Sequence, residues 1–150
     1  MAGLLKWLVP AMGAACAAIG VFHLVLGIDS VPGEASAGAT VDSRERYYGA
    51  VFLGYGLAWI WTARQSPVPS SAVRWLAGIF LLGGIGRLLS MAVHGPPQGF
   101  QTVLTVLELA LPPLYFWLSD ADERAAADAA EGRGCEDDRR PTRPRVQRRR

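Results

Sequence analysis

Residues 72–93 read AVRWLAGIFLLGGIGRLLSMAV and contain two charged side chains, Arg74 near the start and Arg87 far inside. A helix needs about 20 mostly apolar residues to cross the hydrocarbon core of a bilayer, so this stretch is long enough to span a membrane. A charged group at that depth is costly unless it has a partner. The stretch therefore predicts a membrane helix and marks Arg87 as a candidate functional residue.

Three other segments, residues 4–28, 47–62 and 100–118, are also long and apolar, and 47–62 is the shortest of them. Charges lie mostly elsewhere, since 16 of the 28 charged residues fall in residues 122–150. A soluble helical bundle is an alternative, but soluble helices normally carry a charged face that these segments lack. The sequence therefore predicts an all-α, polytopic membrane protein, an antiparallel bundle of four transmembrane helices within residues 1–119.

Residues 120–150 form a charged tail. Residues 120–131 can extend the last helix, whereas residues 132–150 are polar and contain proline, a composition typical of disorder. Seven arginines follow from Arg139 onward, without an acidic residue among them. Such a cluster predicts contact with anionic lipid headgroups at the cytoplasmic surface. The tail lacks aromatic residues, which argues against binding of nucleic acid.

Lysine and arginine are unevenly divided between the two sides of a four-span topology. One side carries Lys6, Arg64, Arg74 and nine tail arginines, and the other carries Arg44 and Arg46. The positive-inside rule then predicts a multi-pass protein of the bacterial inner (plasma) membrane with both termini cytoplasmic. The tryptophans, which favour membrane interfaces, are expected at the cytoplasmic helix ends: Trp7, Trp59, Trp61, Trp75 and Trp117.

Polar residues of different helices fall at similar depths in the outer half of this bundle. At a rise of about 1.5 Å per residue, Arg87 lies about 9 Å and Glu108 about 12 Å from the outer helix ends. His23 lies about 8 Å from the same surface, and Tyr47 and Tyr48 open the second helix there. The sequence thus predicts one polar layer to which every helix contributes.

Helical periodicity predicts which residues face one another. Residues spaced by three or four share one helix face, and small residues allow membrane helices to approach closely. The facing stripes expected on helices one, three and four are Cys16, Gly20, His23 and Gly27; Gly83, Arg87, Ser90 and His94; and Gln101, Thr105, Glu108 and Pro112. The residues expected to pack helices together are Ala50, Gly54, Ala58, Gly83 and Gly86.

The segment before residue 47 resembles a helix start. Asp42 is placed to accept hydrogen bonds from first-turn amides, and Glu45, three residues later, is placed to reach back toward it. Asp42, Glu45 and Arg46 are therefore assigned to a helix cap at the outer interface, with binding as the alternative role.

Arg87 and Glu108 admit two interpretations. In the first, they form an interhelical ion pair that fixes the register of helices three and four. In the second, Arg87 offers a forked donor to a carboxylate, a phosphate or a quinone oxygen, and Glu108 neutralises it or accepts a proton. The candidate ligand-binding or proton-relay residues are Arg87, Glu108, His23, Tyr47, Tyr48 and Ser90.

Several short motifs carry a resemblance to a known family: GVFHL at residues 20–24, DSRERYYGA at 42–50, GIGRLLS at 84–90 and ELALPP at 108–113. Over residues 4–118 the chain resembles DUF4345, a small bacterial four-helix membrane family of unknown function. The resemblance implies a four-span integral membrane protein and supplies no reaction. Its matching positions are His23, Tyr47, Tyr48, Gly49, Arg87 and Glu108.

Three functions compete. The first is a membrane protein that binds a small molecule or relays protons through the polar layer. The second is a structural or accessory subunit of a larger complex or a homo-oligomer, docked through small-residue faces. The third is a membrane redox enzyme, but no catalytic arrangement at diagnostic spacing is present, so we assign no catalytic residues. The two cysteines indicate no metal site, and no cofactor is indicated.

Overall fold

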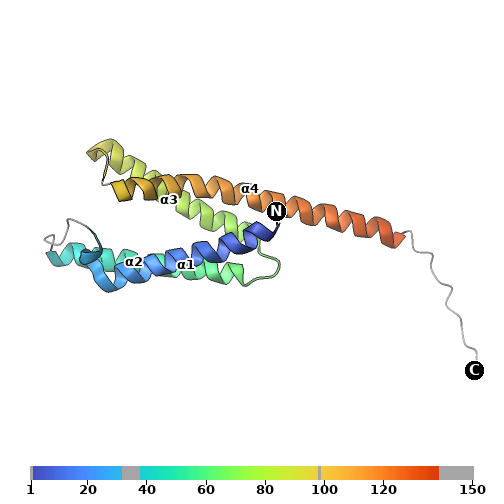
Figure 1. The fold of residues 1–150 in the computed structure, drawn as a ribbon, viewed down its shortest axis with the longest axis horizontal. Coiled ribbons are helices and arrows are strands. Elements are labelled where there is room, and N and C mark those ends of the chain that lie inside the picture. The colour runs from blue at the N-terminus through green and yellow to red at the C-terminus, as the bar shows by residue number, and fades with distance from the viewer. Residues whose placement is uncertain (1, 32–37, 98, 139–150) are drawn as a thin grey trace, which may run out of the picture.

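The computed structural model describes residues 2–31, 38–97 and 99–138, and within these ranges the side chains of residues 4–131. The described chain forms four α-helices and no strand: α1 (Ala2–Leu26), α2 (Gly38–Ala63), α3 (Ser70–His94) and α4 (Gly99–Asp138). A short 3-10 helix, η1 (Gly27–Ser30), follows α1 (Figure 1). The predicted all-α, four-helix fold is confirmed.

Three helical segments are long and apolar enough to cross a membrane: Leu4–Ser30, Ser70–His94 and Gly99–Glu131. These segments support the prediction of a membrane protein. Helix α2 is not among them, because Arg46, two adjacent tyrosines and four glycines dilute its apolar residues.

The helices form two antiparallel hairpins, α1 with α2 and α3 with α4, and contacts are densest within each hairpin. We call the end that holds the start of α1, the α2–α3 connection and residues 115–123 of α4 the base. The opposite end, which holds the α1–α2 and α3–α4 connections, is the distal end. Figure 1 shows both hairpins running between these ends, with α4 continuing beyond the base.

Glycines spaced by seven residues bring α1 and α2 together. Gly13 and Gly20 lie on α1, and Gly49 and Gly56 lie on α2. A Cβ atom at Gly20 would lie 2.7 Å from the Cα atom of Leu53, and one at Gly56 would lie 2.8 Å from the Cα atom of Ala17. Seven residues are close to two helical turns, so these positions form one stripe of direct backbone contact, which we call the glycine seam.

The apolar core lies at the base, where the two hairpins meet. Its buried members are Leu5, Val9, Met12, Cys16, Trp59, Val73, Ala77, Tyr115 and Leu118. Aromatic side chains join the hairpins there: the rings of Trp59 and Tyr115 are 4.9 Å apart, and the Tyr55 hydroxyl donates to the carbonyl of Leu76 at 2.6 Å. The Tyr115 hydroxyl donates to the carbonyl of Leu8 at 3.0 Å. The base is therefore the tightly packed part of the bundle.

Four tryptophans, Trp7, Trp61, Trp75 and Trp117, are exposed at the base, where interfacial residues were predicted. Trp59 is not, because it is fully buried in the core. Trp59 does lie at the predicted end of α2, but it is turned toward α4 and packs on Tyr115, so it does not face the interface.

Two predicted helix boundaries also differ from the structure. Helix α2 begins at Gly38, so Asp42 lies inside the helix and is not its cap. Helix α4 continues to Asp138, so residues 132–138, predicted to be disordered, are helical. The alanine-rich residues 125–130 favour helix and carry α4 past the predicted end. The seven tail arginines from residue 139 onward lie outside the described residues.

Candidate functional site

Arg87 on α3 and Glu108 on α4 form an ion pair within the apolar part of the second hairpin. The Arg87 Nε donates to the Glu108 Oε2 at 2.7 Å. The two partners differ in exposure, since the Glu108 side chain is 11% exposed and the Arg87 side chain is 37% exposed. The depths worked out from the sequence correctly placed these two residues at one level.

Adjacent glycines explain how α3 admits Glu108. A Cβ atom at Gly84 would lie 2.9 Å from Leu109 and 3.1 Å from the Cβ atom of Glu108, so Gly84 allows α4 to pack closely. Gly83 is exposed, and a Cβ atom there would meet only the Glu108 Oε2, at 3.9 Å. One glycine therefore packs the hairpin, and the other leaves open space beside the carboxylate.

Gln101 and Thr105 complete the polar cluster on α4. The Arg87 Nη1 donates to the Gln101 Oε1, and the Thr105 hydroxyl donates to the Gln101 carbonyl at 2.9 Å. We call Arg87, Glu108 and Gln101, with Thr105, the arginine cluster. Gln101 was placed on the right helix stripe but was not chosen as a site residue. Its spacing of four residues to Thr105 and seven to Glu108 puts all three on one helix face and is the signal that could have identified it.

His23 does not join the arginine cluster in the described contacts. Its Nδ1 is 2.6 Å from the Ser30 hydroxyl, which in turn donates to the Gly27 carbonyl. His23 therefore belongs to the distal end of the first hairpin, where it supports the turn that ends α1. The predicted single layer is divided into two polar clusters, one in each hairpin.

Asp42 and Arg46 make the second of these clusters. Asp42 Oδ1 accepts from the Ile28 amide at 3.0 Å, and Asp42 Oδ2 accepts from the Arg46 Nε at 2.8 Å. Both hydrogen bonds lower the pKa of Asp42, and the bond from Arg46 has the larger effect. Arg46 Nη1 also donates to the carbonyls of Leu24 and Val25 at 3.0 and 2.9 Å. These residues cap the end of α1 from the neighbouring helix.

The other candidates at the distal end are exposed. Tyr47 and Tyr48 are 65% and 57% exposed and pack edge to face on each other. Ser90 is exposed on α3, and Glu45 lies 4.0 Å from Arg44. The predicted capping interaction of Glu45 with Asp42 is therefore replaced by Asp42 contacts to Ile28 and Arg46.

The predicted packing residues are mostly not at the close contacts. Ala50 and Gly54 are exposed, and a Cβ atom at Gly54 or Gly86 would meet nothing within 4 Å. Ala58 is half-buried and its carbonyl accepts from Thr62. The stripe of Ala50, Gly54 and Ala58 was the wrong face of α2, because the glycine seam turns Gly49 and Gly56 toward α1.

A further ion-pair network at the base was not predicted. Arg74 Nη2 donates to Asp120 Oδ1 and to Glu123 Oε2, each at 2.6 Å. All three side chains are at least 36% exposed. The network ties the start of α3 to α4 at the edge of the apolar region.

Neither curated proteins nor solved structures include a match to this chain. Residues 4–119 match the family described as a domain of unknown function, DUF4345. This range covers α1 from Leu4 onward, the whole of η1, α2 and α3, and α4 as far as Ser119. It includes both polar clusters. The chain therefore belongs to the DUF4345 family.

Proposed function

We propose that this is a multi-pass protein of the bacterial inner membrane that binds, at its arginine cluster, a small amphiphile whose polar end accepts hydrogen bonds. In the proposed topology four helices cross the bilayer, with the base and both termini at the cytoplasmic side. The lysine and arginine distribution supports this orientation, because Lys6, Arg64 and Arg74 lie at the base and Arg44 and Arg46 at the distal end. Helix α2 crosses with α1, since the glycine seam holds the two backbones together along their length.

The observation that carries the binding proposal is the difference in exposure between the two side chains of the ion pair. Glu108 is buried, but more than a third of the Arg87 side chain is open to the surface of the bundle. Arg87 lies about 9 Å inside the end of its helix, among lipid-facing residues such as Leu88 and Leu89. A guanidinium exposed at that depth is stabilised when an acceptor covers it.

The geometry indicates the chemistry of that acceptor. A guanidinium binds carboxylates and phosphates through paired N–H donors, and a quinone oxygen is a neutral alternative. Glu108 already balances the charge of Arg87, so the site suits a ligand that accepts hydrogen bonds without requiring a free positive charge. The open space at Gly83 lies beside the pair, and the apolar surroundings favour a ligand with a hydrocarbon part.

Proton relay has less support than binding. A relay needs a chain of groups within hydrogen-bond reach, yet His23 is bonded to Ser30 in the other hairpin. The Glu108 carboxylate already accepts from Arg87 at 2.7 Å, and no second titratable group continues the chain from it among the described hydrogen bonds.

A structural role is the second candidate, and one observation favours it. Arg87 joins α3 to α4 through Glu108 and Gln101, so the cluster would also serve as a clamp in an accessory subunit or a homo-oligomer. A double-mutant cycle with Arg87→Ala and Glu108→Ala measures this contribution. Strong destabilisation by each single change, largely restored in the double variant, indicates a clamp.

Gly83→Leu separates binding from clamping. The new side chain would cover the open side of the pair, and its Cβ atom meets no backbone. Gly54→Leu is the matched control, because Gly54 is exposed on the other hairpin with nothing within 4 Å of a Cβ atom. We expect Gly83→Leu to fold normally and to lose a small molecule that co-purifies with the wild-type protein and with Gly54→Leu. Retention of the same molecule by Gly83→Leu and Arg87→Ala would refute binding at this cluster.

A further inference from the structure

A pocket of about 550 Å³ lies at the base, lined by residues of three different segments. Leu5 and Lys6 come from α1, residues 63–68 from the end of α2 and the α2–α3 connection, and Asp122 from α4. One water molecule occupies about 30 Å³ in the liquid, so the pocket has room for a polyatomic group. It is far along the bundle from the arginine cluster, which lies toward the distal end.

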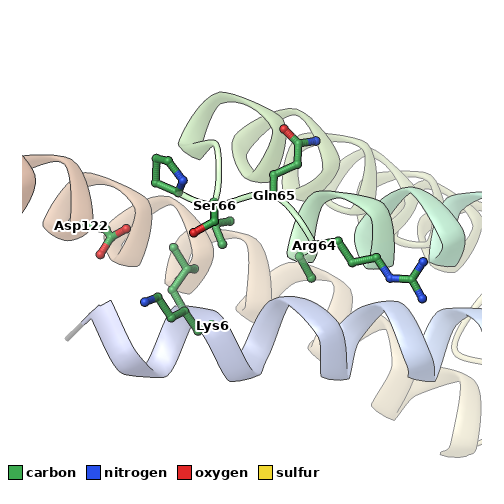
Figure 2. A pocket seen from close by; sticks show the side chains of 9 residues that line it. Lys6, Arg64, Gln65, Ser66 and Asp122 are labelled. Atoms are coloured by element: carbon green, nitrogen blue, oxygen red, sulfur yellow. The ribbon is translucent and has the colours of Figure 1, made fainter.

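The polar groups of this pocket carry both signs of charge. Figure 2 shows Lys6 on α1 and Asp122 on α4 on two walls of the pocket, with Ser66 in the connection between them. The side chains of Arg64 and Gln65 extend away from these three. Among the described residues, neither Lys6 nor Asp122 forms an ion pair. The pocket thus presents a separated cation and anion with a hydroxyl group nearby.

Asp122 differs from the acidic residues beside it. Asp120 and Glu123 both accept from Arg74 on α3. Successive helical residues are turned by about 100°, so Asp122 points to another face of α4, and it lines the pocket with Lys6. Its charge is therefore not used in the network that joins α3 to α4.

The pocket also lies at the level where a membrane protein meets lipid headgroups. Trp7, Trp61 and Trp75 are 78%, 65% and 77% exposed around the same end of the bundle, and exposed tryptophans are enriched at membrane interfaces. Leu5, Ala63 and Val68 supply apolar lining beside the charged groups. Pockets with basic residues between helices at this level are suited to lipid headgroups.

We propose that this pocket binds a phosphoethanolamine group, carried by a phospholipid of the adjoining leaflet. The phosphate lies beside Lys6 and Ser66, and the ammonium donates to Asp122. A glycerol headgroup would place only neutral hydroxyl donors against Asp122, and a choline headgroup has no N–H to donate. The same chemistry is present in a soluble glycerophosphoethanolamine, so the source of the group is part of the test.

The test measures lipid binding to the purified full chain in detergent by native mass spectrometry and by thermal stability. Phosphatidylethanolamine is compared with phosphatidylcholine, phosphatidylglycerol and soluble glycerophosphoethanolamine. We expect phosphatidylethanolamine to bind most tightly. Equal binding of the three lipids would overturn the proposal without any variant. Equal binding of the soluble ester and the lipid supports the phosphoethanolamine site and assigns it to a soluble source.

Substitutions locate the site. Asp122→Asn should weaken phosphatidylethanolamine binding about tenfold, as the loss of one charged hydrogen bond implies, and leave phosphatidylcholine binding unchanged. Lys6→Gln should weaken the binding of both lipids, because both carry the phosphate. Asp128→Asn is the matched control, an exposed residue farther along the same helix. A preference for phosphatidylethanolamine that persists in Asp122→Asn would place its amine elsewhere and refute the assignment.

Discussion

Replacing Gly20 by alanine should force α1 and α2 apart. A Cβ atom there would lie 2.7 Å from the Cα atom of Leu53 and 2.8 Å from the carbonyl oxygen of Gly49. These are backbone atoms, so no side-chain rotation relieves the contact. Ordinary contact begins near 3.4 Å, and 3.4 minus 2.7 gives a local separation of 0.7 Å or more.

The expected cost follows from that separation. A gap of about 0.5–1 Å forfeits roughly a quarter to a half of the dispersion energy between the separated atoms, and overpacking typically costs about 1–3 kcal/mol. Alanine also favours helix over glycine by about 1 kcal/mol. Gly54→Ala contributes that gain alone, because nothing lies within 4 Å of its Cβ position. The two variants should therefore differ by about 1–3 kcal/mol.

The assay is reversible unfolding of the purified protein in mixed detergent, followed by tryptophan fluorescence. Gly20→Ala should unfold at lower denaturant than Gly54→Ala, and Gly56→Ala, on the partner helix, should behave like Gly20→Ala. Equal stability of Gly20→Ala and Gly54→Ala would refute the direct backbone contact on which the seam is built.

Three further predictions concern polar contacts. The lowered pKa of Asp42 means that its carboxylate stabilises the fold above the unfolded-state pKa of about 3.9 and that this stability is lost as the pH falls through the folded-state pKa. Thermal midpoints of wild type and Asp42→Asn should therefore differ at pH 6 and converge in acid; a constant difference contradicts the assignment. Tyr115→Phe removes the hydrogen bond to Leu8 and should cost about 0.5–1.5 kcal/mol in the same unfolding assay, whereas no loss would show that this bond does not hold α4 to α1. Arg74→Gln breaks two exposed ion pairs and should lower the thermal midpoint only slightly, with a smaller effect at high salt; a large, salt-independent loss would contradict its surface position.

The sequence predicted those features that depend on the length and depth of single segments. Apolar length located α1, α3 and the first part of α4, and the count of residues from the helix ends brought Arg87 level with Glu108. Both quantities are properties of one helix in a bilayer of fixed thickness, so no knowledge of the neighbouring helix is needed.

The features that were missed depend on which helix is the neighbour. Helix α2 carries Gly49 and Gly56 on one face and Ala50 and Gly54 on another, and either face suits close packing. The seven-residue spacing, repeated as Gly13 and Gly20 in α1, distinguishes them only when the two helices are considered together. The burial of Trp59 was not predicted for the same reason, since its partner Tyr115 is distant in sequence.

The glycine seam has a consequence for how the protein enters its membrane. Helix α2 is not among the helices that are apolar enough by composition to span a membrane. Its glycines leave backbone uncovered, and lipid offers that backbone no hydrogen-bond partners. Contact with α1 covers that backbone. We therefore expect α2 to insert into the bilayer as the second half of a preformed hairpin with α1. In a chain that lacks α1, α2 should fail to insert, and a glycosylation acceptor placed after α2 should stay unmodified. In this view α1 acts as an intramolecular insertion chaperone, and its sequence is constrained by its partner's biogenesis as well as by its own stability.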